Sequence, residues 1–459
     1  MRTARPTRPR YSWRTPRPLA APPPQPSSSP TIVDELIVDE SERGLHIGFY
    51  SNHLCERGSE VALFDYADYS ERLCGARSFI LYDAKSSKNV DIVVTKFKAR
   101  FGDRLIPLEA VDPDLGHAVL RHQLSHCYVI KFGHCEEPAL RCFGAAASAC
   151  RILVHAVFDA SEPHGHAYAR ISPCVPCRPS RRAARVPVVP HIVRPAALHG
   201  SDLRAELGIP TSATVFGRSG GLDTFDIPEA RAAVLSVALQ RSDVWFVLLN
   251  TSRHGWSEAW RLVEKAGGGG GGGGGGSGRG RARALPPNII HLDATVDEAR
   301  KQAFVRTCDA MLHARRTGET FGLSVAEFSA CNKPVLTSSR HHECGAANFH
   351  LTTLGGKGLY YHSMRSCEQL LLGFDRTAAR RRDWNAFRAF EPAKVMRTFW
   401  EVFIRSAPAR SCEALSPSSS SDDDDAVDAR SVRRPTGAGP AAGSGGASLN
   451  PFMLAAGIT

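Results

Sequence analysis

The sequence predicts an α/β fold built from two doubly wound domains, and three observations support this prediction. Short apolar runs rich in β-branched residues recur between residues 44 and 363, and several are continuous, which is typical of strands covered on both faces. Helical stretches lie between many of these runs, as they do in a doubly wound sheet. The chain has 459 residues, of which 42% are hydrophobic, so it is too long for one ordinary core.

The apolar runs form two groups, separated by a domain junction that we expect near residues 189–200. The strands expected before the junction cover residues 44–51, 77–83, 127–133, 151–158 and 186–193, and the helix that follows the first of them covers 59–74. The strands expected after the junction cover 213–219, 243–250, 288–293, 310–315, 333–338 and 358–363, with helices over 227–240, 295–308 and 321–331. Each group therefore predicts one doubly wound sheet.

Composition separates these domains from segments that cannot pack a core. Ten consecutive glycines, Gly267–Gly276, indicate a flexible surface insertion, because a phosphate-binding loop needs glycines at set offsets on a strand-to-helix turn. The predicted organisation is an Arg/Pro-rich arm over residues 1–43, a first domain over 44–193, a second domain over 194–370 with the glycine-rich insertion at 266–284, C-terminal helices that pack back over 371–405, and a disordered tail over 406–459.

The formal net charge of +11 does not by itself indicate a nucleic-acid partner. The first 30 residues hold six arginines and no acidic residue, so the remainder carries +5 (11 − 6 = 5). An enzyme with an anionic substrate accounts for that excess as well as a nucleic-acid binder does. A nucleic-acid binder also needs basic and aromatic residues that share one face, and the sequence shows no such cluster. We therefore expect no nucleic acid.

The expected location follows from the absence of targeting signals in the sequence. No apolar run reaches the length of about 18 residues that a membrane span needs, and no secretory segment follows the arginine-rich arm. We expect a soluble, cytoplasmic protein without a transmembrane segment, for which peripheral membrane contact stays open. The alternative is import into an organelle through residues 1–30, although their prolines disfavour the amphipathic helix of many transit peptides.

The cysteines predict buried free thiols rather than a metal site. All 13 are spread through the chain, several of them inside apolar runs. Cys174 and Cys177 form one Cys-x-x-Cys pair, but a zinc site needs a second pair of ligands at comparable spacing, and "HHEC" at 341–344 is a poor substitute. We expect no metal.

The stretch "GETFGLSVAEFSACNKPVLT", residues 318–337, carries two glutamates in a largely apolar context. Seven residues separate Glu319 from Glu327, and none of them is basic. We expect Glu319 in a loop and Glu327 two turns into the following helix, about 10 Å along its axis. This distance matches a diphosphate with a sugar at each end, so we expect hydroxyl groups of a bound sugar nucleotide as their partners. The alternative for each glutamate is a solvated or capping carboxylate.

The expected start of this helix offers a second indication of an anionic ligand. A helix N-terminus leaves backbone N–H groups unpaired and favours negative charge, and a glycine there lets a ligand approach closely. The residues expected to present these amides are Thr320, Phe321, Gly322 and Leu323.

The same stretch resembles the Glu-x7-Glu signature of retaining GT-B glycosyltransferases of the family-4, glycogen-synthase-like type (glycosyl transferases group 1), with Asn332 where glycine is usual. The resemblance in architecture covers residues 44–405. It implies two Rossmann-like domains with a cleft between them. It also implies that Glu319 approaches the hydroxyls of the donor sugar as a catalytic residue, that Glu327 holds the ribose hydroxyls, and that helix amides receive the diphosphate.

Two stretches of the first domain fit the same resemblance. "RGSE" resembles the glycine-rich loop after the first strand, which implies that Gly58 and Ser59 face the donor phosphates or the acceptor; a plain tight turn is the alternative. His155 ends an expected strand where many relatives place a histidine near the anomeric carbon; a satisfied core histidine is the alternative. His164 is a further candidate on the acceptor side.

Two stretches of the second domain fit it as well. Arg218 follows a strand at the position of the phosphate-binding arginine, but the lysine usual a few residues later is missing, so Arg315 or Arg316 must supply the second positive charge or catalysis is weakened. "NIIHLD" resembles the segment that contacts the nucleotide base, with Leu292 and Asp293 nearest.

The predicted function is therefore transfer of a sugar, of the hexosyltransferase kind, from a nucleoside diphosphate sugar to a hydroxyl acceptor (a glycan, a lipid or a small molecule) with retention of anomeric configuration. The resemblance implies no metal and no cofactor besides the donor substrate. The alternatives are a nucleotide-sugar epimerase of the same fold and a non-catalytic nucleotide-sugar-binding protein, for which the missing lysine is the best support.

Overall fold

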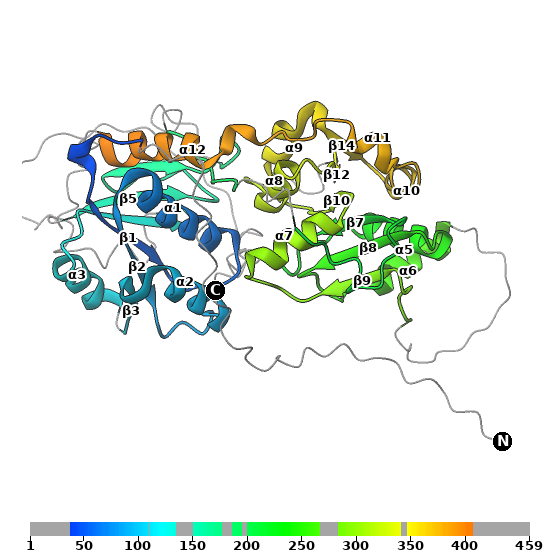
Figure 1. The fold of residues 1–459 in the computed structure, drawn as a ribbon, viewed down its shortest axis with the longest axis horizontal. Helices are drawn as coiled ribbons and strands as arrows, with labels where there is room; N and C mark the ends of the chain where they lie inside the picture. Colours follow the sequence, from blue (N-terminus) through cyan, green and yellow to red (C-terminus); the bar gives the residue numbers. More distant parts are fainter. Residues whose placement is uncertain are drawn as a thin grey trace, which may run out of the picture. The chain divides into compact units, whose positions relative to one another are not determined.

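The computed structural model describes residues 37–109, 111–134, 150–176, 186–194, 200–266, 283–340 and 347–406. These residues form two parallel six-stranded sheets with flanking helices (Figure 1), which confirms the predicted two-domain, Rossmann-like α/β class. The predictions for residues 1–36 of the arm, most of the glycine-rich insertion, the tail after Ser406, Cys177 and the "HHEC" segment lie outside the described residues. The last part of the expected arm is described: Glu40–Glu42 form a short 3₁₀ helix, and Val38 is buried.

The first sheet has the strand order β3-β2-β1-β4-β5-β6, and all neighbouring strands are parallel. The chain runs outward from β1 to β3 and then crosses to β4 on the other side, so the order reverses between β1 and β4. The elements of this half are β1 (His46–Ser51), α1 (Gly58–Cys74), β2 (Arg77–Asp83), α2 (Asp91–Phe101), β3 (Leu105–Leu108), α3 (Val111–Arg121), β4 (His126–Lys131), β5 (Arg151–Ala156) and β6 (Ala167–Arg170).

The second sheet repeats this arrangement, with the order β14-β12-β10-β7-β8-β9 and parallel pairing throughout. Its order reverses between β7 and β10. Its elements are β7 (Thr214–Arg218), α5 (Pro228–Gln240), β8 (Val244–Leu249), α6 (Trp256–Ala266), β9 (Ile289–Leu292), α7 (Glu298–Thr307), β10 (Ala310–His313), α8 (Leu323–Ala330), β12 (Val335–Ser338), β14 (Gly358–Tyr361) and α10 (Met364–Leu372). A small two-stranded ladder pairs β11 (Gly318–Glu319) with β13 (Ala347–Asn348), which leads into α9 (Phe349–Leu354).

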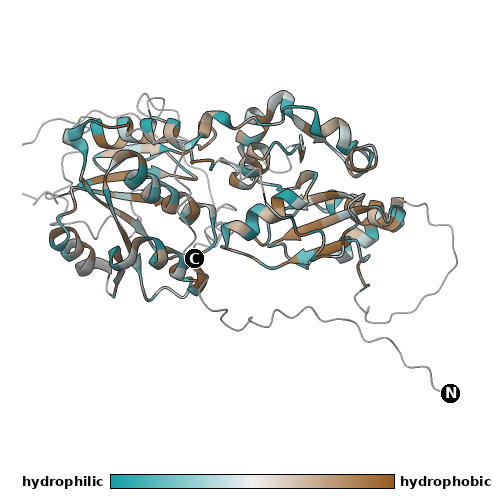
Figure 2. Cartoon of the chain, in the orientation of Figure 1, coloured by the Kyte–Doolittle hydropathy of each residue, from teal (hydrophilic) through white to brown (hydrophobic). Residues whose placement is uncertain are grey.

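The inner strands of both sheets carry continuous apolar runs because helices cover both faces of each sheet, so that side chains on both faces of an inner strand are buried. Successive residues of β1 point to opposite faces, yet Phe49 and Tyr50 are both buried, at 0% and 3% exposure. Figure 2 shows the resulting brown, hydrophobic colouring along strands of both sheets.

The strand expected at residues 186–193 does not form. This segment makes a single bridge, between Val188 and Arg170, and no ladder. Pro187 and Pro190 lack the N–H groups that a ladder needs, which explains why an apolar, β-branched run stays irregular here.

The last described helices return to the first half of the chain. The ring of Phe399 in α12 (Pro392–Phe399) stacks on Tyr66 of α1 with centroids 5.0 Å apart. Arg151 donates hydrogen bonds of 2.8 and 2.7 Å to the carbonyls of Ile404 and Ser406. Among the described helices, none combines the length and the apolar character needed to cross a membrane.

Candidate functional site

The carboxylate of Glu319 lies just beyond the carboxyl end of β10, and protein groups hold it there. Arg315 Nη1 donates to Oε2 at 2.8 Å, and His313 Nε2 lies 3.2 Å from Oε1. Because an ionised carboxylate only accepts hydrogen bonds, His313 carries a proton on Nε2, and its Nδ1 lies 2.9 Å from the Thr337 hydroxyl. Burial opposes ionisation of Glu319, but the charge of Arg315 and the hydrogen bond from His313 outweigh it and lower the pKa to about 2.

This lowered pKa predicts part of the acid unfolding of the protein. It lies below the ordinary value of 4.5, so the stability it contributes is fully present above a pH of about 4.5 and is lost as the pH falls through about 2. The shift corresponds to about 3 kcal/mol. We expect the free energy of unfolding, measured with urea between pH 6 and pH 2, to fall by about 2 to 3 kcal/mol more in the wild type than in Glu319→Gln. Parallel curves for the two proteins would contradict the ion pair.

His350 is a neighbour of Glu319 that the sequence reading missed. Its ring centroid lies 4.8 Å from that of His313, and the residue is 2% exposed. Its Nδ1 is buried without a hydrogen-bond partner among the described residues. Burial lowers the pKa of His350 to about 3, so the ring is neutral at physiological pH. The pairing of β13 with β11 brings this histidine to Glu319 from 31 positions further along the chain, and no local pattern could have indicated it.

Glu327 also has a protein partner. It is the fifth residue of α8, about 6 Å along the helix axis from the first residue, so it lies one turn into the helix instead of the two expected. Its Oε1 accepts from Nζ of Lys301, which comes from α7. Burial alone would lower the pKa of Lys301, but the charge of Glu327 raises it. The expectation that both glutamates depend on a ligand for their partners is therefore wrong for this structure.

The start of α8 differs from the prediction by two to three residues. Gly322 is the N-cap, with a φ of 86°, and the helix begins at Leu323. Phe321 is 2% exposed and stacks on Phe349 with centroids 5.2 Å apart, so packing fixes it ahead of the helix. Thr320 lies in a bend that also precedes the helix. The open amides accordingly begin at Leu323, since the amide of Ala326 already bonds to the carbonyl of Gly322.

Gly58 and Ser59 begin α1, and Gly58 lies close to the start of α8. A Cβ atom at Gly58 would be 3.5 Å from Cδ1 of Leu323. Ser59 Oγ donates to Oε2 of Glu60 at 2.9 Å. Burial raises the pKa of Glu60 to about 7, and the hydrogen bonds from Ser59 and Cys55 only partly offset this. The structure thus brings the start of α1 close to the start of α8, and the role of Gly58 and Ser59 at the donor phosphates or the acceptor stays a prediction.

His155 lies in the core of the first sheet and faces no opening. It is 0% exposed, its Nδ1 lies 2.7 Å from the hydroxyl of Tyr128, and its Nε2 donates to the carbonyl of Val189 at 2.8 Å. Burial lowers its pKa to about 3. Both ring nitrogens are used, which matches the alternative of a satisfied core histidine. His164 is also tied locally, with Nδ1 at 2.5 Å from the carbonyl of Glu162.

Arg218 ends β7, but its guanidinium organises a loop. Nη1 donates to the carbonyl of Asn250 at 2.7 Å and to the hydroxyl of Thr251 at 2.8 Å. Nη2 donates to the carbonyl of Gly221 at 2.7 Å and to the hydroxyl of Thr224 at 2.6 Å. The residue is 2% exposed, and burial lowers its pKa to about 10. A phosphate could reach Arg218 only if these bonds were exchanged.

The remaining predicted residues lie at separate places along the second sheet. Leu292 ends β9, the edge strand, and its carbonyl accepts from the Asn250 amide at 2.9 Å; the exposed Asp293 follows it. Either Arg315 or Arg316 was expected to supply a second positive charge. The guanidinium of Arg315 is hydrogen-bonded to Glu319, and the backbone amide of Arg316 donates to the carboxylate of Asp226 at 2.8 Å.

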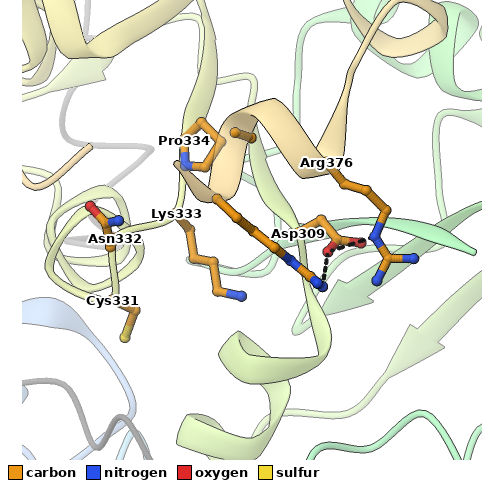
Figure 3. Close-up of a pocket in the computed structure, with 8 residues that line it drawn as sticks. Asp309, Cys331, Asn332, Lys333, Pro334 and Arg376 are labelled. Atoms are coloured by element: carbon orange, nitrogen blue, oxygen red, sulfur yellow. Dashed lines mark hydrogen bonds and ion pairs between the residues drawn. The ribbon is translucent and has the colours of Figure 1, made fainter. Parts of the chain in front are cut away.

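A pocket of about 180 Å³ lies at the opposite, amino-terminal edge of β10 and β12 (Figure 3). Its lining includes Asp309, Lys333, Arg376 and Arg380. Asp309 accepts from Arg204 at 2.9 Å and forms ion pairs with Arg376 at 3.5 Å and Arg380 at 3.4 Å. Asn332 of the signature lines this pocket, but none of the predicted catalytic or donor-binding residues does, so the candidate site is the group around Glu319.

Comparisons with known proteins support the same architecture. Neither the models of protein families nor the curated proteins gave a match to the sequence. Among solved structures, a glycosyltransferase from Rickettsia africae is 12% identical with a TM-score of 0.55, and the match covers 78% of this chain and 97% of that one. HepE of Anabaena in complex with UDP-glucose is 15% identical with a TM-score of 0.51, covering 78% and 98%.

A third neighbour is the trehalose-6-phosphate synthase OtsA, which is 11% identical with a TM-score of 0.51, covering 79% of this chain and 100% of that one. The three matches each extend over nearly the whole of the other chain, so they concern the complete two-sheet arrangement. Together with the repeated strand order of the two sheets, they show that this chain has the GT-B fold of these glycosyltransferases.

Proposed function

We propose that this chain is a glycosyltransferase that moves a sugar from a nucleoside diphosphate sugar to a hydroxyl acceptor with retention of anomeric configuration. One observation carries the proposal: Glu319 is kept ionised by Arg315 and oriented by His313 at the carboxyl edge of β10. Ligands of doubly wound sheets bind outside the carboxyl ends of the strands, where this group lies. The GT-B fold of the solved neighbours supports the same reaction class.

In the proposed reaction the bond between the anomeric carbon and the β-phosphate oxygen breaks, and a bond from the acceptor oxygen to that carbon forms on the same face. The acceptor proton passes to a β-phosphate oxygen. Negative charge grows on the leaving diphosphate, and the open amides that begin at Leu323 would stabilise it. Glu319 would accept hydrogen bonds from hydroxyls of the donor sugar, and Glu327 from those of the ribose.

The positive charge for this reaction is assigned to Arg315. The guanidinium of Arg218 is committed to four hydrogen bonds in its loop, whereas Arg315 is 20% exposed and lies on Glu319. A diphosphate beside Glu319 would share this guanidinium. We propose that these protein groups take the place of a divalent cation on the diphosphate.

A second candidate function, binding of a nucleotide sugar without turnover, is favoured by one observation. Arg218 is buried, and no lysine follows it between residues 219 and 226. A protein with this arrangement could bind a nucleotide sugar without turning it over. An epimerase of the same fold is a further candidate, which would convert its donor without an acceptor.

The test is a screen of the purified full chain with UDP, GDP, ADP and the matching sugar nucleotides. HepE was solved with UDP-glucose, so UDP and its sugars come first. We expect the nucleoside diphosphate of one base to raise the melting temperature of the protein. The sugar nucleotide of that base should release the free nucleoside diphosphate only when an acceptor is present. Adding Mg²⁺ or Mn²⁺ should leave kcat within about twofold. Stabilisation without turnover would favour the binding protein, turnover without acceptor would favour the epimerase, and no response to any nucleotide would overturn the proposal.

A further inference from the structure

The turn between β1 and α1 gathers three side chains of the kinds that bind metal ions. A ring nitrogen of His53, the Sγ of Cys55 and a carboxylate oxygen of Glu60 all lie within 4.8 Å of one another. Among the described residues this is the one group of three or more such side chains. No metal was expected from the sequence, because Cys174 and Cys177 have no second pair of ligands at comparable spacing and the resemblance implies none; these three residues were not among the candidate ligands.

The backbone holds these three side chains in place without help from a ligand. Leu54 lies between His53 and Cys55 and is 0% exposed. Its amide donates a hydrogen bond to Oδ1 of Asn89 at 2.8 Å. Its carbonyl accepts from the amide of Val90, also at 2.8 Å. Glu60 lies in the first turn of α1, whose start fixes its direction. The backbone of the turn that carries His53 and Cys55 is therefore fixed before any ion arrives.

No basic side chain of the described residues forms an ion pair with the carboxylate of Glu60, on which the charge of Arg57 acts through space. The residue is 5% exposed. Its hydrogen-bond donors among the described residues are the hydroxyls of Ser51, at 3.4 Å, and Ser59, at 2.9 Å, and the thiol of Cys55, at 3.4 Å. All three donors are neutral. A buried carboxylate is costly unless a charge compensates it, and a cation at this point would do so.

We propose that His53, Cys55 and Glu60 bind one zinc ion, or another divalent cation that accepts a thiolate. Nitrogen, sulfur and carboxylate oxygen form a ligand set that zinc prefers, and three protein ligands leave the fourth tetrahedral position for water. Bond lengths of about 2.0 to 2.3 Å place ligand atoms roughly 3.3 to 3.8 Å apart, so the trio closes by about 1 Å on binding. Mg²⁺ prefers oxygen ligands and is not expected here.

The charges balance on binding. The thiol of Cys55 gives up its proton to solvent, as does the carboxyl of Glu60 in chains where it is protonated. A sulfur–metal bond replaces the sulfur–hydrogen bond, and no electron is transferred. The thiolate and the Glu60 carboxylate together offset the two positive charges of the ion. Arg57 and Lys88 repel a cation near His53, while Asp83 attracts it. The ion would stabilise the conformation of the turn that precedes Gly58, the residue that lies near Leu323. The proposal does not depend on glycosyl transfer.

The test is the metal content and the cobalt spectrum of the purified full chain. We expect close to one equivalent of zinc per chain, and a thiolate-to-cobalt charge-transfer band when Co²⁺ is added to protein stripped of zinc. The variants Cys55→Ser, His53→Ala and Glu60→Gln should each weaken metal binding on the order of 100-fold and, for Cys55→Ser, abolish the band. Mg²⁺ should not compete with Co²⁺.

Cys150→Ser is the matched control, because Cys150 is a buried cysteine that precedes β5, outside the trio. It should keep the band and the zinc. Circular dichroism checks that every variant is folded, and His53→Ala, at the least buried of the three positions, keeps the test open if Cys55→Ser does not fold. A wild-type chain that binds neither ion at micromolar concentration would overturn the proposal. So would a band that survives Cys55→Ser or disappears in Cys150→Ser.

Discussion

Replacing Glu319 by glutamine is expected to lower kcat about 30- to 1,000-fold while leaving the affinity for free nucleoside diphosphate nearly unchanged. The physical reason is the charge that develops on the sugar as the leaving group departs. A carboxylate held ionised next to that charge stabilises it, and the amide of glutamine does not. The loss of such an interaction in the transition state costs about 2 to 4 kcal/mol. Single-turnover rates and nucleotide titrations of both proteins measure the two quantities.

The same substitution also removes the ion pair with Arg315, so a stability control is needed. Glu71 offers one, because it pairs with Arg104 and Arg100 and is 15% exposed, close to the 17% of Glu319. Glu71→Gln should lower the melting temperature by a similar amount and leave kcat unchanged. Equal kcat values for wild type and Glu319→Gln would remove Glu319 from the reaction. A comparable loss of kcat in Glu71→Gln would assign the effect to stability.

The fold was predictable because its determinants are local. Continuous apolar runs such as those in 77–83 and 244–249 became inner strands, and the amphipathic or alanine-rich stretches between such runs became helices. The run at 186–193 has the same composition but carries two prolines, and the missing N–H groups outweighed its apolar character. The first turn of α8 was misplaced because Gly322 adopts a left-handed conformation and Phe321 packs into an aromatic cluster.

The candidate site was predictable only where one segment builds it. Glu319 and the open end of α8 lie within a single strand–loop–helix unit, so their proximity follows from the sequence. The partners of the two glutamates do not. Lys301 reaches Glu327 from α7, and His350 reaches Glu319 through the β11–β13 ladder, which are tertiary contacts that no spacing encodes.

Tertiary contacts that sequence spacing does not encode also decide where the residues assigned by resemblance alone point. Arg218 is the last residue of β7, as expected, and His155 is the last but one of β5, but a place near a strand end does not fix where a side chain points. Tyr128 and the carbonyl of Val189 use both ring nitrogens of His155, and loop carbonyls and hydroxyls use the guanidinium of Arg218. Their proposed roles stay predictions that site-directed variants can test.

Replacing Glu327 by glutamine should change binding rather than turnover. If its carboxylate accepts hydrogen bonds from the ribose, the substitution weakens the donor and the free nucleoside diphosphate alike, by about 1 to 3 kcal/mol, or roughly 5- to 150-fold. The value of kcat at saturating donor should stay within a few-fold of wild type. Calorimetric titration with the free diphosphate measures the first effect, and initial rates at saturating donor measure the second.

The ion pair with Lys301 allows the binding role of Glu327 to be separated from a structural one. The two side chains are only 21% and 24% exposed, so Glu327→Gln leaves a half-buried ammonium without its partner and should lower the free energy of unfolding by about 1 to 3 kcal/mol. The double variant Glu327→Gln with Lys301→Met removes both charges and should recover much of that stability. It should not recover nucleotide affinity, because methionine restores no acceptor for the ribose. If the double variant regains both, the pair only supports the fold. If neither variant changes affinity, the ribose is held elsewhere, and the diphosphate alone would remain for α8 to bind.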